Sequence, residues 1–385
     1  AAARAQGPST IASNIAGMSY LEGTQISAGA QVVFGDLSVN ENSNTTNSGS
    51  NSGNAMNPLP AAAFFITHAV DENWSVGFGS YGDFGLAYEY DKDWSGRYFA
   101  QEGTILGMSM VPSVAYRFND QWSVGLGLRA MYGFLETKMG FDNRPFDPAA
   151  SDGQIKYKDE DWGYGGNAGV IYQPQEGTRI GLAYTSKVDL NFGDGLEFDG
   201  LHPAGEALLQ TTGIQGAYTK IDLQVPQTAT LSLYQKLDER WALLASTNWQ
   251  DWSEFGEIAV NLDANAISAN KNLNAHYKDT WHLSLGTQYQ ATDKWLWNAG
   301  VAYDSSAVSD GNRTWSNPMA EQYRIATGAT YALDENTDLN LSYALILMGD
   351  IEVDQTKQLN ANDRVAGSFD NAWLSAINGS MTWRF

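Results

Sequence analysis

A short polar turn, followed by tryptophan and then by strict alternation, recurs four times in this chain. The four copies read Asp-Glu-Asn-Trp74, Asn-Asp-Gln-Trp122, Asp-Glu-Arg-Trp241 and Thr-Asp-Lys-Trp295. After Trp122, apolar side chains at Val124, Leu126 and Leu128 are separated by serine or glycine. A period of two indicates a β-strand. An aromatic residue at the same end of strand after strand is typical of a membrane barrel, where the apolar band meets the lipid headgroups.

Composition restricts how such a chain can cross a membrane and what it can bind. Of its 385 residues 43% are hydrophobic, yet no run approaches the roughly 20 apolar residues that a transmembrane helix needs. Any span must therefore be a strand. The absence of cysteine excludes disulfides and thiolate chemistry. The net charge of −22 argues against a nucleic-acid partner, and we expect no cofactor.

Alternation predicts an all-β chain that forms a 14-stranded antiparallel transmembrane β-barrel over residues 24–385. The expected strands cover residues 24–39, 59–69, 74–90, 103–118, 122–140, 162–173, 179–193, 219–237, 241–262, 279–291, 295–304, 322–333, 338–349 and 372–385. An even number is usual in a closed bacterial barrel. Six tight connections alternate with seven longer ones, which predicts that both termini are periplasmic. A soluble β-sandwich or propeller also alternates, but it gains nothing from an aromatic at each strand end.

The parity of each strand predicts which residues face lipid. In residues 179–193 the apolar set is Ile180, Leu182, Tyr184, Val188, Leu190 and Phe192, and the opposite set includes Arg179, Lys187, Asp189 and Asn191. We expect the apolar set to face lipid and the polar set to line the lumen. Glycines on the lumenal side make room for a plug or for ligand pockets; they are Gly125, Gly127, Gly181, Gly286, Gly300 and Gly328.

The strand after Trp74 contains the most informative irregularity. Its expected lipid-facing positions are Trp74, Val76, Phe78, Ser80, Gly82, Phe84, Leu86, Tyr88 and Tyr90. Two adjacent positions, Ser80 and Gly82, are nearly empty. Glycine within a strand often marks a bulge or kink. One interpretation is a bulge without function. The other is a hole in the wall beside Gly82, Asp83, Phe84 and Gly85, through which an apolar molecule leaves sideways.

Two long loops carry apolar residues that would face external water. They are Phe141 and Phe146 in one loop and Leu201, Leu208 and Leu209 in the other. Such residues suggest a capture surface, although each loop could instead pack on its own base. The second loop also holds an acidic group, Asp194, Glu197, Asp199 and His202. These side chains could bind calcium, but the twelve-residue spacing of a calcium loop is missing. We therefore expect no metal site.

Catalytic patterns are weak in this sequence. It has four histidines, His68, His202, His276 and His282, and neither a Gly-x-Ser-x-Gly elbow nor a His-Glu-x-x-His pair. We expect no enzymatic activity, and an outer-membrane lipase stays as an alternative because triad partners can lie far apart in sequence. The chain ends on Phe385 in an alternating strand, which resembles the terminal signal that the outer-membrane barrel insertion machinery recognises.

Several segments, in order, resemble the FadL family of outer-membrane long-chain fatty-acid transporters. Asn14-Ile15-Ala16-Gly17 is similar to the family's Asn-Pro-Ala hatch motif, and residues 74–90 resemble its kinked third strand. Tyr277-Lys278-Asp279 and the run from Gly300 to Ser306 resemble its tenth and eleventh strands. The resemblance implies a fourteen-stranded barrel with an N-terminal hatch, an external capture groove and an exit through the third strand.

Carried over by position, the family's roles fall on specific residues. Phe141, Phe146, Leu201, Leu208 and Leu209 would line the groove, Lys278 would pair with a ligand carboxylate, and the kink would lie at Gly82–Gly85. The family's other internal basic residue falls nearest Lys138. The hatch would be residues 1–23, with Asn14, Ile15 and Ala16 as its motif. Ile15 replaces the family's proline, and by this resemblance the chain begins later than the family's hatch, so we expect an incomplete hatch. Residues 1–17 also lack the apolar run of a signal peptide.

The resulting hypothesis is passive uptake of long-chain fatty acids or similar hydrophobic molecules through the bacterial outer membrane. The cargo would be captured by external loops, bound in the lumen and released laterally through the third strand. An aromatic-hydrocarbon channel of the same family is the main alternative, ahead of a general porin or a lipase. We expect the barrel to be a monomer embedded among lipopolysaccharide and phospholipid.

Overall fold

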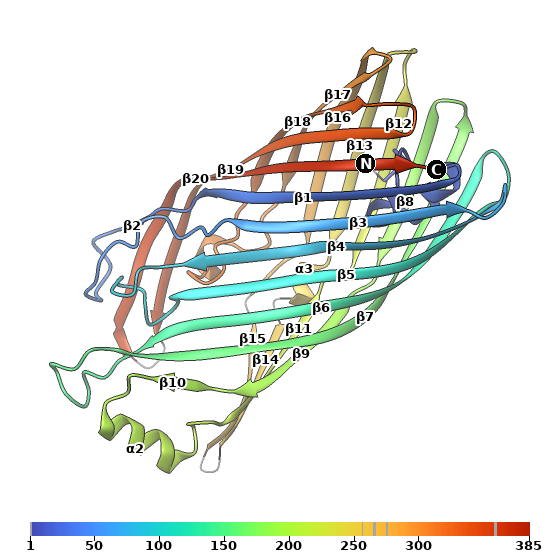
Figure 1. Cartoon of the computed structure of the whole chain (residues 1–385). Helices are drawn as coiled ribbons and strands as arrows, with labels where there is room; N and C mark the ends of the chain where they lie inside the picture. Colours follow the sequence, from blue (N-terminus) through green and yellow to red (C-terminus); the bar gives the residue numbers. More distant parts are fainter. Residues whose placement is uncertain (1, 256, 265–266, 275, 358–359) are drawn as a thin grey trace.

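The computed structural model describes residues 2–385 apart from 256, 265–266, 275 and 358–359. Among these residues one sheet holds sixteen strands; two short ones, β2 (Val39–Glu41) and β10 (Glu197–Asp199), are appendages, and the other fourteen close into an antiparallel barrel (Figure 1). The barrel strands are β1 (Thr24–Asp36), β3 (Leu59–Ala69), β4 (Trp74–Glu89), β5 (Glu102–Arg117), β6 (Trp122–Phe141), β7 (Gly153–Gln175), β8 (Thr178–Thr185), β12 (Thr228–Lys236), β13 (Trp241–Gln250), β16 (Thr280–Thr292), β17 (Trp295–Asp304), β18 (Gln322–Ala332), β19 (Thr337–Lys357) and β20 (Asn360–Arg384). The predicted fourteen-stranded barrel is confirmed.

The first and last barrel strands close the sheet. β1 pairs with β20 from Gln25 opposite Arg384 to Asp36 opposite Trp373. Both termini lie toward the end of the barrel with the short turns, and the long loops lie at the other end (Figure 1). No helix in the described part of the chain is long and apolar enough to cross a membrane.

The recurring turn has one structure in all four copies. The side-chain oxygen three residues before each tryptophan accepts the tryptophan backbone N–H and the N–H one residue earlier; the acceptors are Asp71, Asn119, Asp238 and Thr292. These are Asx-type turns and a threonine counterpart. Each tryptophan ring then lies on the tyrosine opposite it in the neighbouring strand, with centroids 4.4–4.7 Å apart in the pairs Trp74–Tyr116, Trp122–Tyr172, Trp241–Tyr289 and Trp295–Tyr331. The repeat thus builds an aromatic girdle on the outer face.

Three of the predicted strands are broken in the structure. The segment 179–193 divides into β8 and β9 (Val188–Gly195), and 219–237 divides into β11 (Tyr218–Val225) and β12. The segment 241–262 divides into β13, α3 (Trp252–Phe255) and β14 (Glu257–Ala264). Together with β15 (Ile267–Asn274), the detached pieces form a separate four-stranded sheet in the order β15-β14-β11-β9.

The break after β8 reverses a predicted orientation. Ile180, Leu182 and Tyr184 are exposed on the outer face as expected, but Val188, Leu190 and Phe192 are buried. Val188 packs at Gly163 of β7 and Leu190 packs at Gly133 of β6, both on the inner wall. The prediction that β9 turns its apolar side to lipid was therefore wrong. The chain bends at Ser186 and Lys187, so β9 joins a sheet whose apolar face points into the barrel.

The N-terminal segment lies inside the barrel. It forms α1 (Thr10–Ser13) and the 3₁₀ helix η1 (Ile15–Tyr20). A side chain at Gly125 would lie 2.5 Å from the Ala16 nitrogen, and one at Gly181 would lie 2.9 Å from the Ala2 oxygen. Gly125 and Gly181 therefore make room for the N-terminal segment, which is the first of the two roles considered for the lumenal glycines. Gly286, Gly300 and Gly328 instead lie against neighbouring strands.

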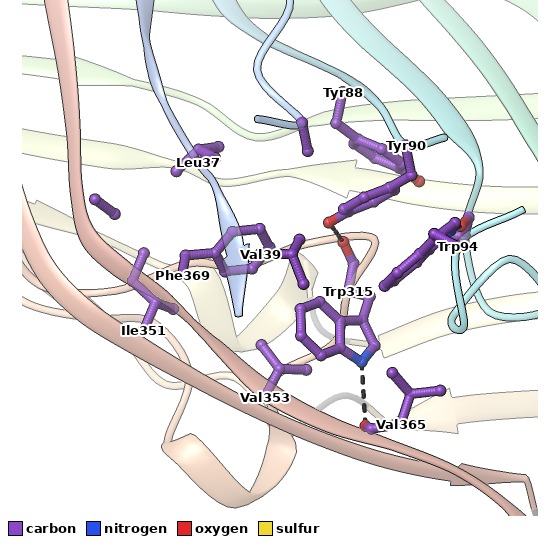
Figure 2. Packing of buried hydrophobic residues seen from close by; sticks show 13 residues of the cluster. Leu37, Val39, Tyr88, Tyr90, Trp94, Trp315, Ile351, Val353, Val365 and Phe369 are labelled. Carbon is purple, nitrogen blue, oxygen red and sulfur yellow. Dashed lines mark hydrogen bonds between the residues drawn. The ribbon is translucent and has the colours of Figure 1, made fainter. Parts of the chain in front are cut away.

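An aromatic cluster joins Tyr88 at the long-loop end of β4, and the segment that follows it, to the extensions of β19 and β20 (Figure 2). Tyr90 stacks on Trp94 at 4.2 Å, and Trp94 meets Trp315 edge-on at 5.4 Å. The Tyr90 hydroxyl donates to the Trp315 carbonyl at 2.7 Å, and the Trp315 indole N–H donates to the Val365 carbonyl at 3.2 Å. The buried polar atoms are thus paired, as burial requires.

Candidate functional site

The wall of the barrel is interrupted between β3 and β4. Their ladder runs from Ala69 opposite Ser75 to Phe64 opposite Ser80, and there it ends among the described residues. Beyond Ser80, residues 59–63 pair with β1 on their other side, and β4 continues along β5. Gly82 is exposed, and a side chain there would meet only the Ala61 Cβ, at 3.9 Å. The wall is therefore thin beside Gly82, and this thin part ends at Gly85, where a side chain would lie 2.6 Å from Leu59 of β3.

A β-bulge lies at the same place. The β4–β5 register shifts between Gly82 and Phe84, which leaves Asp83 as an extra residue. One extra residue inverts the alternation of everything that follows. Phe84 packs against the inner apolar cluster, and Tyr88 and Tyr90 are buried at the mouth of the barrel. Leu86 also packs against the aromatic cluster of Tyr90 and Trp94. The prediction that Phe84, Leu86, Tyr88 and Tyr90 continue the lipid-facing row was wrong for this reason.

The bulge turns the Asp83 carboxylate inward onto a buried arginine. Arg129 of β6, with 4% of its side chain exposed, holds Asp83 Oδ1 at 2.7 Å through Nη2. Its Nε donates to the Ser109 hydroxyl at 2.9 Å, and that hydroxyl in turn donates to Asp83. Sequence reasoning missed Arg129 and Ser109. The signal was present, because Arg129 shares its parity with the inward Gly125 and Gly127.

An apolar cluster lines the inner wall beside this ion pair. Its buried members are Met131, Tyr157, Val188, Leu190, Phe192, Leu223 and Val225, and Phe84, Ile105 and Phe255 pack against it. These residues come from β4 to β7 on one side and from the detached sheet on the other. The arrangement places a packed apolar cluster inside a barrel whose inner wall elsewhere carries buried polar residues such as Ser109, Ser123 and Asn167.

The two apolar loops that were predicted to form a capture surface meet at the long-loop end. Phe141 and Phe146 stack with parallel rings at 6.5 Å, and Phe146 stacks on His202 at 6.1 Å. His202 caps α2 (Pro203–Thr212) by accepting from the Ala204 N–H, and Phe146 packs against Gly205 in that helix. Leu209 is buried and Leu208 is half exposed, while Leu201 is partly buried.

One buried side chain fastens these loops together. Asn143 is 1% exposed and donates to the Ser151 carbonyl at 2.8 Å and to the Gly200 carbonyl at 2.9 Å. It also accepts from the His202 N–H at 3.0 Å. Beside it, a hydrogen bond to the Asp142 carboxylate raises the pKa of the Arg144 guanidinium. Sequence reasoning missed Asn143, because nothing in its local pattern marks a contact with a loop 57 residues away.

The two lysines predicted to bind a ligand carboxylate lie in different parts of the wall. Lys138 of β6 contacts Glu102 at 2.5 Å and Glu136 at 3.4 Å. Lys278 is exposed before β16, five positions from β6 in the strand order. Its neighbour Tyr277 stacks on Phe255 at 6.1 Å, and burial raises the pKa of the Tyr277 hydroxyl. The structure does not bring the two lysines together.

Several of the acidic and histidine residues have structural partners. Glu197 contacts Lys156 at 3.4 Å, and His282 Nδ1 lies 2.8 Å from Asp304 Oδ1, whose carboxylate also contacts Arg324. His68 Nδ1 lies 2.9 Å from the Thr24 hydroxyl. Within the described residues, no three His, Asp or Glu side chains are grouped to hold a metal ion.

The predicted hatch motif contacts the wall directly. The Asn14 side chain accepts from the Ala16 N–H at 3.1 Å, so it caps η1. Its amide donates to the carbonyls of Val170 and Leu182 at 3.1 and 3.3 Å. Ile15 is 2% exposed and packs at Gly125 and Gly127. The segment is therefore fastened to three neighbouring strands, β6, β7 and β8.

Comparison with known proteins places this architecture in a family. The family model described as "Outer membrane protein transport protein (OMPP1/FadL/TodX)" matches residues 1–385. A long-chain fatty acid transport protein of Escherichia coli is 27% identical over 382 residues, which cover 91% of this chain and 83% of the relative. A Pseudomonas aeruginosa FadL homologue superposes with a TM-score of 0.87 at 20% identity, covering 98% of this chain and 94% of that structure. The Pseudomonas putida toluene transporter TodX superposes with a TM-score of 0.72 at 17% identity, covering 98% and 94%. The chain belongs to the OMPP1/FadL/TodX family of outer-membrane transport proteins and is a β-barrel of the bacterial outer membrane.

Proposed function

We propose that this barrel takes up long-chain fatty acids or similar hydrophobic molecules and releases them sideways into the membrane. The observation that carries the proposal is the end of the β3–β4 ladder at Ser80 beside the bulge at Asp83. A fatty acid transporter among the relatives supports the cargo class. The N-terminal segment fastened across the lumen argues against release straight through the barrel.

The physical problem is to keep an apolar solute out of water along its whole path. Lipopolysaccharide excludes such solutes, and a water-filled pore offers them no favourable surface. Burial contributes about 25 cal/mol per Å² of apolar area, which is several kcal/mol for a long acyl chain. The loops that contain Phe146 and Leu208 would capture the cargo, the apolar cluster around Met131 would receive it, and the thin wall at Gly82 would release it.

A disulfide across the thin wall tests the lateral exit. Ala61→Cys and Gly82→Cys would place two Cβ atoms 3.9 Å apart, within the range of about 3.5 to 4.5 Å that a disulfide requires. The protein has no other cysteine. We expect oxidation to stop uptake of a labelled long-chain fatty acid by cells that express the variant, and reduction to restore it.

A matched disulfide elsewhere in the wall supplies the control. Leu285→Cys and Val301→Cys lie directly opposite each other in the intact β16–β17 ladder, and that bridge should leave uptake unchanged. Wild-type uptake by the oxidised Ala61–Gly82 variant would contradict lateral release. If the unmodified protein takes up toluene but no fatty acid, the aromatic alternative, which the toluene transporter TodX represents, replaces the fatty-acid reading.

We further propose that the barrel acts as a monomer among lipopolysaccharide and phospholipid, after placement by the barrel insertion machinery, and that it has no enzymatic activity. Hydrolysis of phospholipid by the purified protein, lost on His282→Ala, would overturn the last point and support the lipase alternative.

A further inference from the structure

An ion pair between a buried arginine and a partly exposed aspartate lies at the thin part of the wall. Arg129 and Asp83 are 2.7 Å apart, with 4% and 17% of their side chains exposed. Ser109 closes a triangle by accepting from Arg129 and donating to Asp83. Such an ion pair is weak evidence of stabilisation, because both charges must give up water to form it. Removing one partner leaves the other charge unpaired. A role in fixing geometry is therefore a better explanation for this pair.

The ion pair lies at the β4 bulge. A β-bulge changes the direction of a side chain and weakens local pairing, and Asp83 is the residue that the β4 bulge adds. On its N-terminal side β4 is held by β3 only as far as Ser80. Between Ser80 and the buried Ala87, the Asp83 carboxylate is the group that fastens β4 to the inner wall by charge.

Arg129 also contacts a second interruption of the wall. Its Nη1 donates to the Ser186 carbonyl at 3.5 Å, a long hydrogen bond. Ser186 lies where β8 ends and the chain bends inward, just beyond the last ladder pair, Asn167 opposite Thr185. There the Ser186 N–H donates to the Gly166 carbonyl, and the Gly166 N–H donates to the Ser186 hydroxyl, each at 2.9 Å. One guanidinium thus lies between the two places where strand pairing stops.

We propose that Arg129 is a positioning residue for lateral release: it holds the Asp83 bulge inward and so fixes the position of Gly82 beside Ala61, where the β3–β4 ladder has ended. This inference rests on the proposed function. Each of the three guanidinium nitrogens of Arg129 contacts a wall group, so the role proposed for it is to set the position of β4 and not to bind the transported molecule.

The rate of disulfide formation between Ala61→Cys and Gly82→Cys reports this geometry without any cargo. In the whole chain in outer-membrane vesicles, we expect Arg129→Met to slow disulfide formation about tenfold. Asp83 then loses its charged partner, so the bulge no longer holds residue 82 beside residue 61. Arg129→Lys should restore part of the rate, since an ammonium keeps the charge but cannot form the three separate bonds. Fatty-acid uptake should fall in the same order.

Two milder variants cover the case in which Arg129→Met does not fold. Asp83→Asn removes the charge while keeping the shape, and Ser109→Ala removes the hydroxyl that joins Arg129 to Asp83. Both variants should slow cross-linking, and Asp83→Asn should slow it more than Ser109→Ala. The Leu285→Cys/Val301→Cys bridge should form at an unchanged rate in every background. An unchanged rate of Ala61→Cys/Gly82→Cys cross-linking in the folded Arg129→Met or Asp83→Asn background would overturn the inference. If the Ala61→Cys/Gly82→Cys protein with Arg129 intact cross-links as expected while the unmodified protein transports no fatty acid, the proposed function alone is contradicted.

Discussion

At the scale of single residues, glycines and short polar side chains determine what the inside of this barrel can hold. Asn14 makes three bonds at once, one to η1 and two to the wall. Gly169 of β7 faces it so closely that any side chain there would collide with the Asn14 amide oxygen. The sequence predicted Asn14 as part of a hatch motif by resemblance. It could not identify Gly169 as the residue it contacts, since that contact depends on how the segment enters the lumen.

Gly169→Ala should therefore loosen the N-terminal segment without disturbing the strands. The added methyl group displaces the Asn14 side chain, which then no longer caps η1. Loss of such a cap lowers the stability of the segment by about 1 to 2 kcal/mol. We expect intermittent ion conductance in planar bilayers. Gly166→Ala is the matched control in the same strand, because a side chain there meets nothing closer than 3.6 Å. Equal conductance of the two variants would show that Asn14 does not secure the segment.

At the scale of elements, alternation predicted the existence and boundaries of most strands but not their continuity. The run from Ile180 to Phe192 keeps one register in sequence, with the single polar residue Ser186 on its apolar side, yet its second half faces the opposite way. A bulge or bend changes which face a residue occupies while leaving the local pattern intact. The same reason explains Phe84 and Tyr88 after the β4 bulge. Parity was reliable only between such irregularities.

The detached β9 is fastened to β7 by side chains where backbone pairing is missing. The Asn191 N–H donates to Asp161 at 2.7 Å, and the Gly193 N–H donates to Asp159 at 2.5 Å. We expect Asp159→Ala with Asp161→Ala to speed hydrogen exchange at both amides about tenfold, since bonds to charged acceptors contribute roughly 1.5 to 3 kcal/mol each.

Exchange should be followed residue by residue in the detergent-solubilised barrel. Asp189→Ala serves as the control, because this carboxylate accepts from the Gln224 side chain on the same sheet. Unchanged exchange at Asn191 and Gly193 in the double variant would mean that backbone contacts alone hold β9 in place.

At the scale of the whole molecule, closure of the barrel and filling of its lumen are separate features of the chain. β1 starts at Thr24 and pairs with both β3 and β20, so the ring of strands closes without the residues before it. The inner wall that the N-terminal segment covers carries buried polar groups, among them Ser113, Ser123 and Asn167. Sequence parity predicted this polar lumen, but only the contacts of Ala16 and Asn14 reveal what fills it.

Deleting residues 1–20 should therefore convert the protein into an open pore. The barrel should still insert and resist unfolding in mild detergent, because its strand ladders are untouched, while water enters a lumen lined by serine and asparagine. We expect steady ion conductance in planar bilayers from the deletion variant and none from the full chain. Steady conductance of the full chain would favour the general-porin alternative. A deletion variant that folds and remains closed would mean that the detached sheet and the aromatic cluster around Trp315 block the lumen by themselves.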